Sequence, residues 1–219
     1  MSACFRQRIY PLLCFFAFIP VLFLSCIGTS SQIALKNDGS GTIIQEYRIS
    51  LELENMGKLD GNEKQPPVPF SKKDIERTVE RVPGLRLLSF RTHEDGKDRI
   101  YRAELAFNSP EALVSLFSAN NQQVKVDIPQ KRIEISFLAA EKTDLAFREI
   151  MEDAFAGYEF SISFSVPGAA KTAWIDENGN KALQFPGACS VRDKTADYSA
   201  PMADIVYLDK SLTLEVSWQ

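Results

Sequence analysis

Residues 158–167, YEFSISFSVP, contain the clearest secondary-structure pattern in the chain. Large apolar side chains occupy every second position, and Glu159 and three serines lie between them. A period of two is typical of a β-strand that buries one face and exposes the other. The apolar set is Tyr158, Phe160, Ile162, Phe164 and Val166. With Pro167-Gly168 as a turn, this segment predicts a half-buried strand on a hydrophobic core.

Three segments with helical periodicity lie before this strand, and each is followed by two strand-like segments. The first helix begins at Ser71, where Asp74 completes a capping box, and ends at Pro83-Gly84. The second begins at Ser109-Pro110-Glu111, and the third extends from Thr143 to Ala156. The strand-like segments are residues 85–92, 99–107, 124–128, 132–137, 158–166 and 173–175.

The two ends of the chain complete the predicted fold. A strand begins at Ile33, and after a turn at Asn37–Gly41 the alternation extends to Leu53. Residues 186–200 are predicted to be irregular, and 204–208 and 211–218 to form a last pair of strands. Short turns favour antiparallel pairing. We therefore expect an α+β fold in αββ-type units, with a mainly antiparallel sheet and about three helices packed on it, as a single domain over residues 32–219.

The first 26 residues have the features of an export signal. Arg6 and Arg8 precede an apolar run, Leu12–Leu24, and no acidic residue occurs before Asp38. The run of about 13 residues is short against the ~20 that span a bilayer. The residues before Cys26 resemble the lipobox of bacterial lipoproteins, although Phe23 and Leu24 replace the usual leucine and small residue. The alternatives are an uncut anchor and an ordinary secreted protein.

The lipobox resemblance implies a specific processing of the chain. Residues 1–25 would be removed as a signal peptide, and Cys26 would carry acyl chains that anchor the protein in a membrane. Residues 26–31, which are small and polar after the cysteine, would then form a short tether that holds the domain near the bilayer. The expected location is the bacterial cell envelope, with the domain exported to the periplasm or the cell surface.

Charge and cysteine content narrow the class of partner. Without residues 1–25 the chain loses two basic and no acidic residues, which leaves 23 basic against 29 acidic residues and a net charge of −6. Nucleic acid is therefore not an expected partner. If Cys26 is acylated, Cys189 has no partner for a disulfide, and in its apolar surroundings we expect a small core residue rather than a reactive thiol.

The residues that could carry chemistry do not form a recognised motif. His93, the only histidine, lies in a predicted turn beside two acids, and one imidazole does not build the usual zinc site or a triad. Residues 176–180 have calcium-type spacing, but Lys181 takes the position that requires glycine. We therefore predict no metal, no cofactor and no enzymatic activity. The third helix presents Phe147, Ile150, Met151 and Phe155, which form either core or the lining of a ligand pocket.

The order of these elements resembles the LppM-type family of bacterial lipoproteins. The resemblance comprises Cys26, an early strand around DGSGTIIQ, the middle αββ units and the late strand in FSISFSVPGAAKTAW. It implies a membrane-tethered α+β ectodomain that is not an enzyme and has an apolar cavity between helices and sheet for a lipid or glycolipid. No family motif matches at a position that would transfer a site residue.

Three functions are compatible with the sequence. The first is a non-enzymatic envelope lipoprotein whose domain binds a lipid-like ligand or an envelope protein. The second is a structural or assembly component of an envelope complex, which predicts an exposed apolar patch. The third is an unrecognised hydrolase, for which the sequence offers serines and carboxylates but no nucleophile elbow and no second histidine.

Overall fold

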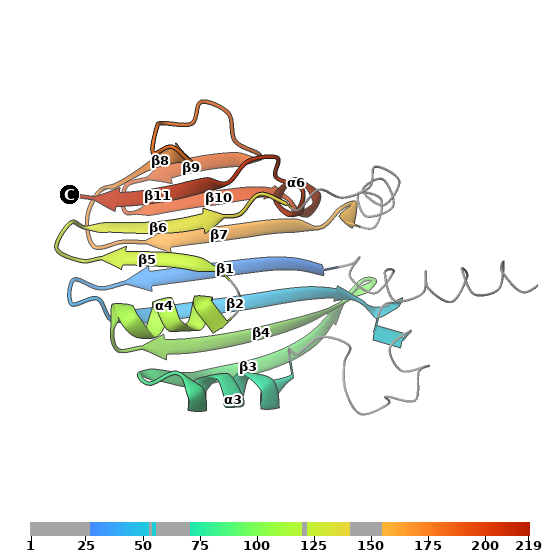
Figure 1. Ribbon diagram of the computed structural model, residues 1–219. Coiled ribbons are helices and arrows are strands. Elements are labelled where there is room, and N and C mark those ends of the chain that lie inside the picture. Colours follow the sequence, from blue (N-terminus) through green and yellow to red (C-terminus); the bar gives the residue numbers. More distant parts are fainter. Residues whose placement is uncertain (1–26, 53, 56–70, 120–121, 141–154) are drawn as a thin grey trace, which may run out of the picture.

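The computed structural model describes residues 27–52, 54–55, 71–119, 122–140 and 155–219. Within these ranges the chain forms strands in two sheets together with three helices, which confirms the predicted α+β class (Figure 1). The helices are α3 (Lys72–Arg81), α4 (Pro110–Ala119) and α6 (Met202–Val206). The strands are β1 (Ile27–Leu35), β2 (Gly41–Ser50), β3 (Leu85–Asp95), β4 (Asp98–Phe107), β5 (Gln123–Asp127), β6 (Arg132–Phe137), β7 (Glu159–Ser165), β8 (Ala170–Asp176), β9 (Ala188–Arg192), β10 (Thr195–Pro201) and β11 (Leu212–Trp218).

The larger sheet has seven strands in the order β3-β4-β2-β1-β7-β10-β9. Its neighbouring strands pair antiparallel except β1 and β7, which are parallel and place Ile33 beside Phe164. The smaller sheet has four antiparallel strands in the order β5-β6-β11-β8. Both sheets therefore combine segments that are far apart in the sequence, and β1 is the central strand of the larger one.

The core lies between the inner faces of the two sheets and is completed by α4. Phe137 of β6 meets Phe160 of β7 edge to face, with ring centroids 5.5 Å apart, and Trp174 of β8 meets Tyr198 of β10 at 4.9 Å. In Figure 1 the smaller sheet overlies the β7-β10-β9 half of the larger sheet, and α4 overlies the other half. Leu113, Leu116 and Phe117 of α4 are buried, as predicted.

Local sequence signals account for the elements that were predicted correctly. The Ser71 side chain accepts from the Asp74 backbone N–H, and the Asp74 carboxylate accepts from the Ser71 N–H, so the capping box starts α3 as expected. The β3–β4 hairpin turns at Gly96, which has a φ of 61°. Residues 143–154 of the predicted third helix lie outside the described residues.

The predicted arrangement was wrong in the second half of the chain. We expected only helices to pack on a single sheet, whereas in the structure a second sheet also packs on the face of the first. Residues 186–200 are not irregular, because they contain the hairpin β9–β10. The inward residues of this hairpin include Ala196 and Ala200. Because these side chains are small, the alternation of apolar and polar residues along β10 is weak in the sequence. Residues 202–206 form α6 instead of a strand, since Met202 and Ile205 lie on one side at helical spacing.

The predicted tether was also wrong. β1 begins at Ile27 and not at Ile33, so residues 27–31 lie in a strand. This segment pairs with β2 on one side, and from Thr29 onward with β7 on the other. Strand pairing uses backbone groups and does not require large side chains, which is why the small residues Gly28 to Ser31 did not reveal it. No spacer therefore separates Cys26 from the sheet.

Candidate functional site

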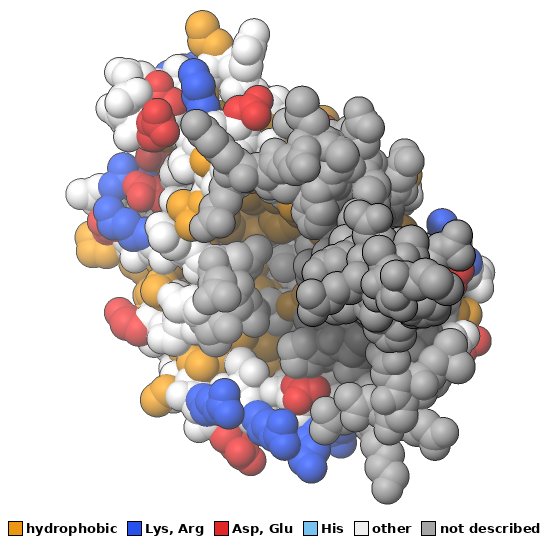
Figure 2. Space-filling model, turned by 45° about the vertical axis from the view of Figure 1, so that its right-hand side comes forward, with side chains coloured by type: hydrophobic (Ala, Val, Ile, Leu, Met, Phe, Trp, Pro, Cys, Tyr) orange, Lys and Arg blue, Asp and Glu red, His pale blue; other side chains and the backbone are white. Residues whose placement is uncertain are grey.

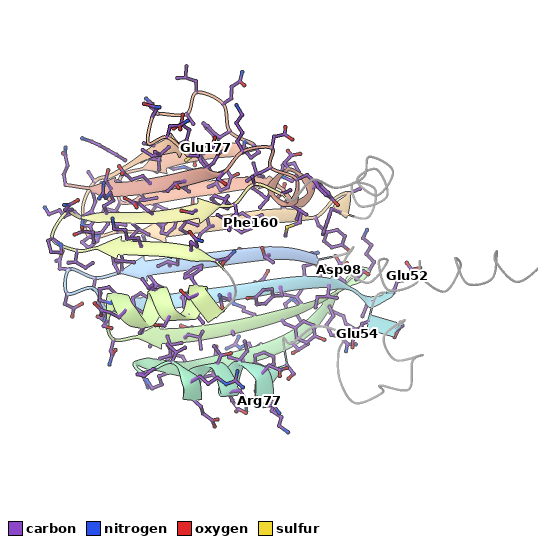
Figure 3. The ribbon with its side chains drawn as sticks, viewed as in Figure 1. Glu52, Glu54, Arg77, Asp98, Phe160 and Glu177 are labelled. Atoms are coloured by element: carbon purple, nitrogen blue, oxygen red, sulfur yellow. The ribbon has the colours of Figure 1, made fainter. Side chains whose placement is uncertain are left out.

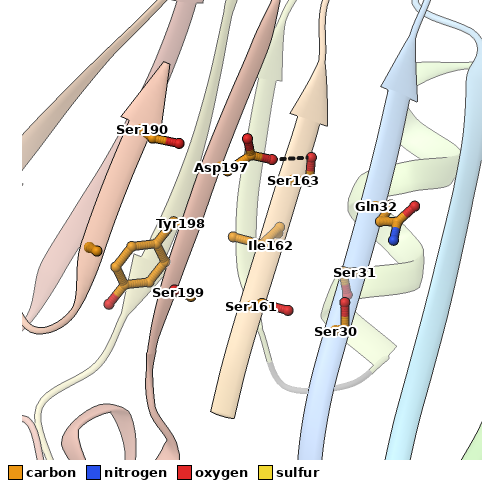
Figure 4. Close-up of a pocket in the computed structure, with 11 residues that line it drawn as sticks. Ser30, Ser31, Gln32, Ser161, Ile162, Ser163, Ser190, Asp197, Tyr198 and Ser199 are labelled. Carbon is orange, nitrogen blue, oxygen red and sulfur yellow. Dashed lines mark hydrogen bonds between the residues drawn. The ribbon is translucent and has the colours of Figure 1, made fainter. Parts of the chain in front are cut away.

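A groove runs along the outer face of the seven-stranded sheet. The alternation that sends Phe160, Ile162 and Phe164 into the core sends the intervening serines outward. Neighbouring strands add more small polar residues in register, and the close-up in Figure 4 shows this face. The side chains on it are Ser30 and Gln32 of β1, Ser161 and Ser163 of β7, Asp197 and Ser199 of β10, and Ser190 of β9.

The groove consists of two open pockets that share Ser30 and Ser161. The first has a volume of about 260 Å³ and lies over β1, β7, β10 and β9. The second has a volume of about 720 Å³ and extends toward the end of the sheet at which β1 begins, where Arg48, Lys97 and Asp98 line it. The groove therefore has a hydroxyl-rich end and a charged end.

The hydroxyl-rich end is organised by Asp197. Ser163 and Asp197 face each other across β7 and β10, and the Ser163 hydroxyl donates to the Asp197 carboxylate at 2.6 Å (Figure 4). A carboxylate and several hydroxyls on one surface offer both acceptors and donors. This end is suited to hydrogen bonding with a polar ligand and not to the enclosure of an acyl chain.

The charged end contains a hydrogen-bond network around the buried Asp98. The Tyr158 hydroxyl donates to Asp98 Oδ1 at 2.8 Å, and Arg48 donates to Asp98 Oδ2 at 3.1 Å and to Asp95 at 3.0 Å. The Lys97 ammonium lies 5.4 Å from the centroid of the Tyr158 ring. In Figure 3, Asp98 lies at the same end of the molecule as Glu52 and Glu54. The network crosses four strands because Tyr158 precedes β7 and Asp98 begins β4.

Gly28 of β1 lies next to Tyr158 in this network. A Cβ atom at Gly28 would lie 3.3 Å from the Glu159 carbonyl oxygen and 3.5 Å from Cδ1 of Tyr158. The Tyr158 side chain therefore lies against β1 where β1 has no side chain of its own, and Tyr158 is buried. Burial opposes the charge of Arg48, yet its hydrogen bonds to Asp98 and Asp95 raise the pKa of the guanidinium above its ordinary value.

The groove does not contain the parts of a histidine-based hydrolase. His93 lies on β3 and pairs with Ile100, whereas Ser163 lies on β7. Three strands separate β3 from β7 in the sheet, which corresponds to roughly 19 Å at ~4.8 Å for each step. That distance is too long for His93 to act as the base for Ser163. Among the described residues no cluster of His, Cys, Asp and Glu is arranged to hold a metal ion.

Most of the predicted site residues lie outside the described residues. These are Cys26 and three members of the candidate pocket: Phe147, Ile150 and Met151. The fourth member, Phe155, is buried in the hydrophobic core, and its carbonyl accepts from the Tyr158 N–H at 3.0 Å. Cys189 is half-buried on β9 and packs against the core, with Sγ 3.5 Å from the Thr172 hydroxyl. The predicted role of Cys189 as a packing residue is consistent with this position.

The groove was not predicted from the sequence. Its lining comes from strands that are distant in the sequence, and two of them, β9 and β10, were predicted to be irregular. The one available signal was the run of outward serines in β7, because small side chains on an exposed strand face leave space above the sheet. The groove itself forms only because β1 and β10 flank β7 and place Ser30 and Ser199 beside its serines.

Comparisons with solved structures give weak similarities. No protein-family profile matches the chain, and no match is found among curated protein sequences. The NMR structure of the folded domain of the Mycobacterium tuberculosis LppM protein covers 89% of this chain and 91% of its own length, with 8% sequence identity and a TM-score of 0.43. This TM-score is below the level that establishes a common fold. None of the described helices is long and apolar enough to cross a membrane.

Proposed function

We propose that this protein is a lipoprotein of the bacterial cell envelope that is anchored through acyl chains on Cys26 after removal of residues 1–25. Its ectodomain is not an enzyme and uses no cofactor. The domain lies outside the cytoplasm, in the periplasm or at the cell surface, and binds a polar envelope ligand or an envelope protein. The signal-like residues before Cys26 and the polar groove on the outer face of the seven-stranded sheet support this proposal.

The observation that carries the proposal is the position of Cys26 directly before β1. Every described strand begins at or after Ile27, so cleavage before Cys26 would leave both described sheets complete. The acylated cysteine would then be attached without a spacer to the central strand of the larger sheet. Each methylene group that enters the bilayer contributes about 0.8 kcal/mol, and two or more chains give stable anchoring.

The groove supports the binding role. Its hydroxyl groups, Asp197 and Arg48 are suited to a ligand with many hydrogen-bonding groups, such as an envelope glycan or a polar headgroup. The lipid-like ligand expected from the sequence would use the pocket of Phe147, Ile150, Met151 and Phe155. Two variants separate these sites: Ser161→Trp would fill the groove, and Met151→Asp would oppose an apolar ligand. The readout is mass spectrometry of small molecules that co-purify with each variant from envelope extracts.

The anchoring experiment compares the full-length protein with Cys26→Ala in a bacterial host. We expect the wild-type chain to lose residues 1–25, to gain a diacylglyceryl group, to incorporate labelled palmitate and to fractionate with membranes. The Cys26→Ala variant should show none of these changes, whereas Cys189→Ser should behave like the wild type. A wild-type chain that is intact or unmodified would contradict the proposal and would leave the apolar run as an uncut anchor or an ordinary secretion signal.

A second function, as an assembly component of an envelope complex, is favoured by one observation. Leu183 is 88% exposed beside β8, and Val191 is 40% exposed on the edge strand β9. Edge strands with exposed apolar side chains are common sites of contact with other chains. A photo-crosslinking residue at position 183 in living cells should capture a single envelope protein, with position 77 on α3 as control. Equal labelling at both positions would argue against this function.

A further inference from the structure

One end of the domain gathers the start of β1 and several chain segments beside it. Thr29 of β1 pairs with Phe160, which in turn pairs with Ala200, so the start of β7 and the end of β10 lie next to the start of β1. α6 follows β10 directly, and the Met202 N–H donates to the Tyr158 carbonyl at 2.9 Å. Figure 1 shows α6 and the first residues of β1 at this same end of the molecule.

Two large apolar side chains are exposed at this end. Leu138, immediately after β6, is 55% exposed, and Val206 at the end of α6 is 39% exposed. The segment that contains Leu138 runs along the segment after α6, because the Ala140 N–H donates to the Leu208 carbonyl at 2.8 Å. In Figure 2, which turns this side forward, hydrophobic side chains show in several separate places, mostly in the left half of the view, and charged side chains lie mainly near its edges.

The chain before β1 limits what can face this end. Residues 12–24 form the apolar run, Cys26 follows, and Ile27 is already the first residue of the strand. An extended residue spans at most about 3.6 Å, so Gly28 lies within about 7 Å of the Cys26 Cα. If Cys26 is held at a bilayer, the end of the sheet is held there too, and no room remains for a protein between them.

We propose that this end of the domain, through Leu138 and Val206, rests on the lipid surface of the membrane. The inference depends on the proposed anchoring at Cys26 and adds the orientation of the domain. Apolar side chains at such a surface insert about 5–10 Å, to the boundary between headgroups and acyl chains. The exposed residues around them carry both signs of charge, as in Glu159, Asp204 and Lys210, so the contact is apolar rather than electrostatic. The charged end of the groove then opens next to the bilayer.

The test measures the depth of single positions in the acylated, full-length protein. Cys4 and Cys14 leave with the signal peptide and Cys26 is blocked by its acyl group, so Cys189→Ser removes the remaining free thiol. In that background a nitrobenzoxadiazole dye is attached at Leu138→Cys or Val206→Cys. Leu183→Cys is the matched control, because Leu183 is 88% exposed and follows Ala182, which pairs with Trp174 at the outer edge of the smaller sheet. Vesicles contain phosphatidylcholine, phosphatidylglycerol and a phospholipid with a nitroxide on its acyl chain.

We expect the nitroxide to quench the dye at positions 138 and 206 at least about threefold more than at position 183, since only an inserted probe reaches that depth. High salt should leave this ratio unchanged. Equal quenching at the three positions, or strongest quenching at position 183, would overturn the orientation while the anchor stands. The intact mass of each sample is determined first: a chain without acyl groups would overturn the proposed anchoring and this inference with it.

Discussion

Tyr158 donates a hydrogen bond to Asp98 across 2.8 Å, although the two residues are 60 positions apart in the sequence. Both side chains are buried, and Arg48 contacts the other carboxylate oxygen of Asp98. This contact joins the start of β7 to the start of β4 across β1 and β2, at the end of the sheet that follows Cys26. It links the charged end of the groove to the stability of the fold.

Loss of this hydrogen bond should destabilise the protein measurably. In Tyr158→Phe the buried Asp98 carboxylate loses a donor, so we expect the free energy of unfolding to fall by about 1.5–3 kcal/mol. Tyr198→Phe is the matched control, because its hydroxyl donates to the neutral carbonyl of Pro186 at 3.0 Å and its loss should cost about 0.5–1.5 kcal/mol. The free energy of unfolding of both variants is measured in urea. Equal losses would show that the hydrogen bond to Asp98 stabilises the fold no more than the hydrogen bond to a neutral carbonyl.

The stability of the domain should decrease at alkaline pH. Burial raises the pKa of Tyr47 from 10.0 to about 12. The folded state therefore resists ionisation of Tyr47. The stabilisation that the neutral Tyr47 side chain gives the fold is fully present below pH 10, and this stabilisation is lost as the pH rises from about 10 to about 12. The loss is at most about 2–3 kcal/mol at 1.36 kcal/mol for each pKa unit. Unfolding measured at several pH values should show a shallower decline in Tyr47→Phe, and an unchanged slope would contradict the assignment.

Phe137 connects the two sheets, and its truncation should be costly. Its ring contacts Phe160, Trp174 and Tyr198 at centroid distances of 5.5, 5.7 and 5.9 Å. Phe137→Ala should lower the free energy of unfolding by about 3–5 kcal/mol and should shift the emission of Trp174. Leu138→Ala changes the adjacent, exposed residue and should alter stability by only about 0.5 kcal/mol. A similar effect of both substitutions would mean that the aromatic cluster does not hold the sheets together.

Gly41 should tolerate no side chain. A Cβ atom at this position would lie 2.0 Å from the carbonyl oxygen of Ala34 in the paired strand β1. Gly41→Ala therefore has to separate β1 from β2, and we expect a loss of about 3 kcal/mol. Gly179→Ala is the control, since its Cβ meets no atom within 4 Å and the φ of 80° costs only about 1 kcal/mol. Thermal unfolding compares the two, and a smaller effect at Gly41 would contradict the close approach.

The local sequence determined the α+β class and most of the single elements. The capping box of Ser71 and Asp74, the turn at Gly96 and the alternation of Phe160, Ile162 and Phe164 act over a few residues, so they could be recognised before any contact was known. The apolar run before Cys26 is equally local, and it remains the basis of the proposed anchor.

Only the tertiary structure decided how these elements combine. The parallel pairing of β1 with β7, the second sheet, the strand at Gly28–Ser31 and the groove around Ser161 depend on contacts between residues far apart in the chain. Small residues such as Ala196, Ala200 and Ser199 carry little hydrophobic signal of their own. They occupy strands because the backbone pairing and the burial of Tyr198 and its neighbours stabilise the whole sheet together. This combined stabilisation does not appear in any local sequence pattern.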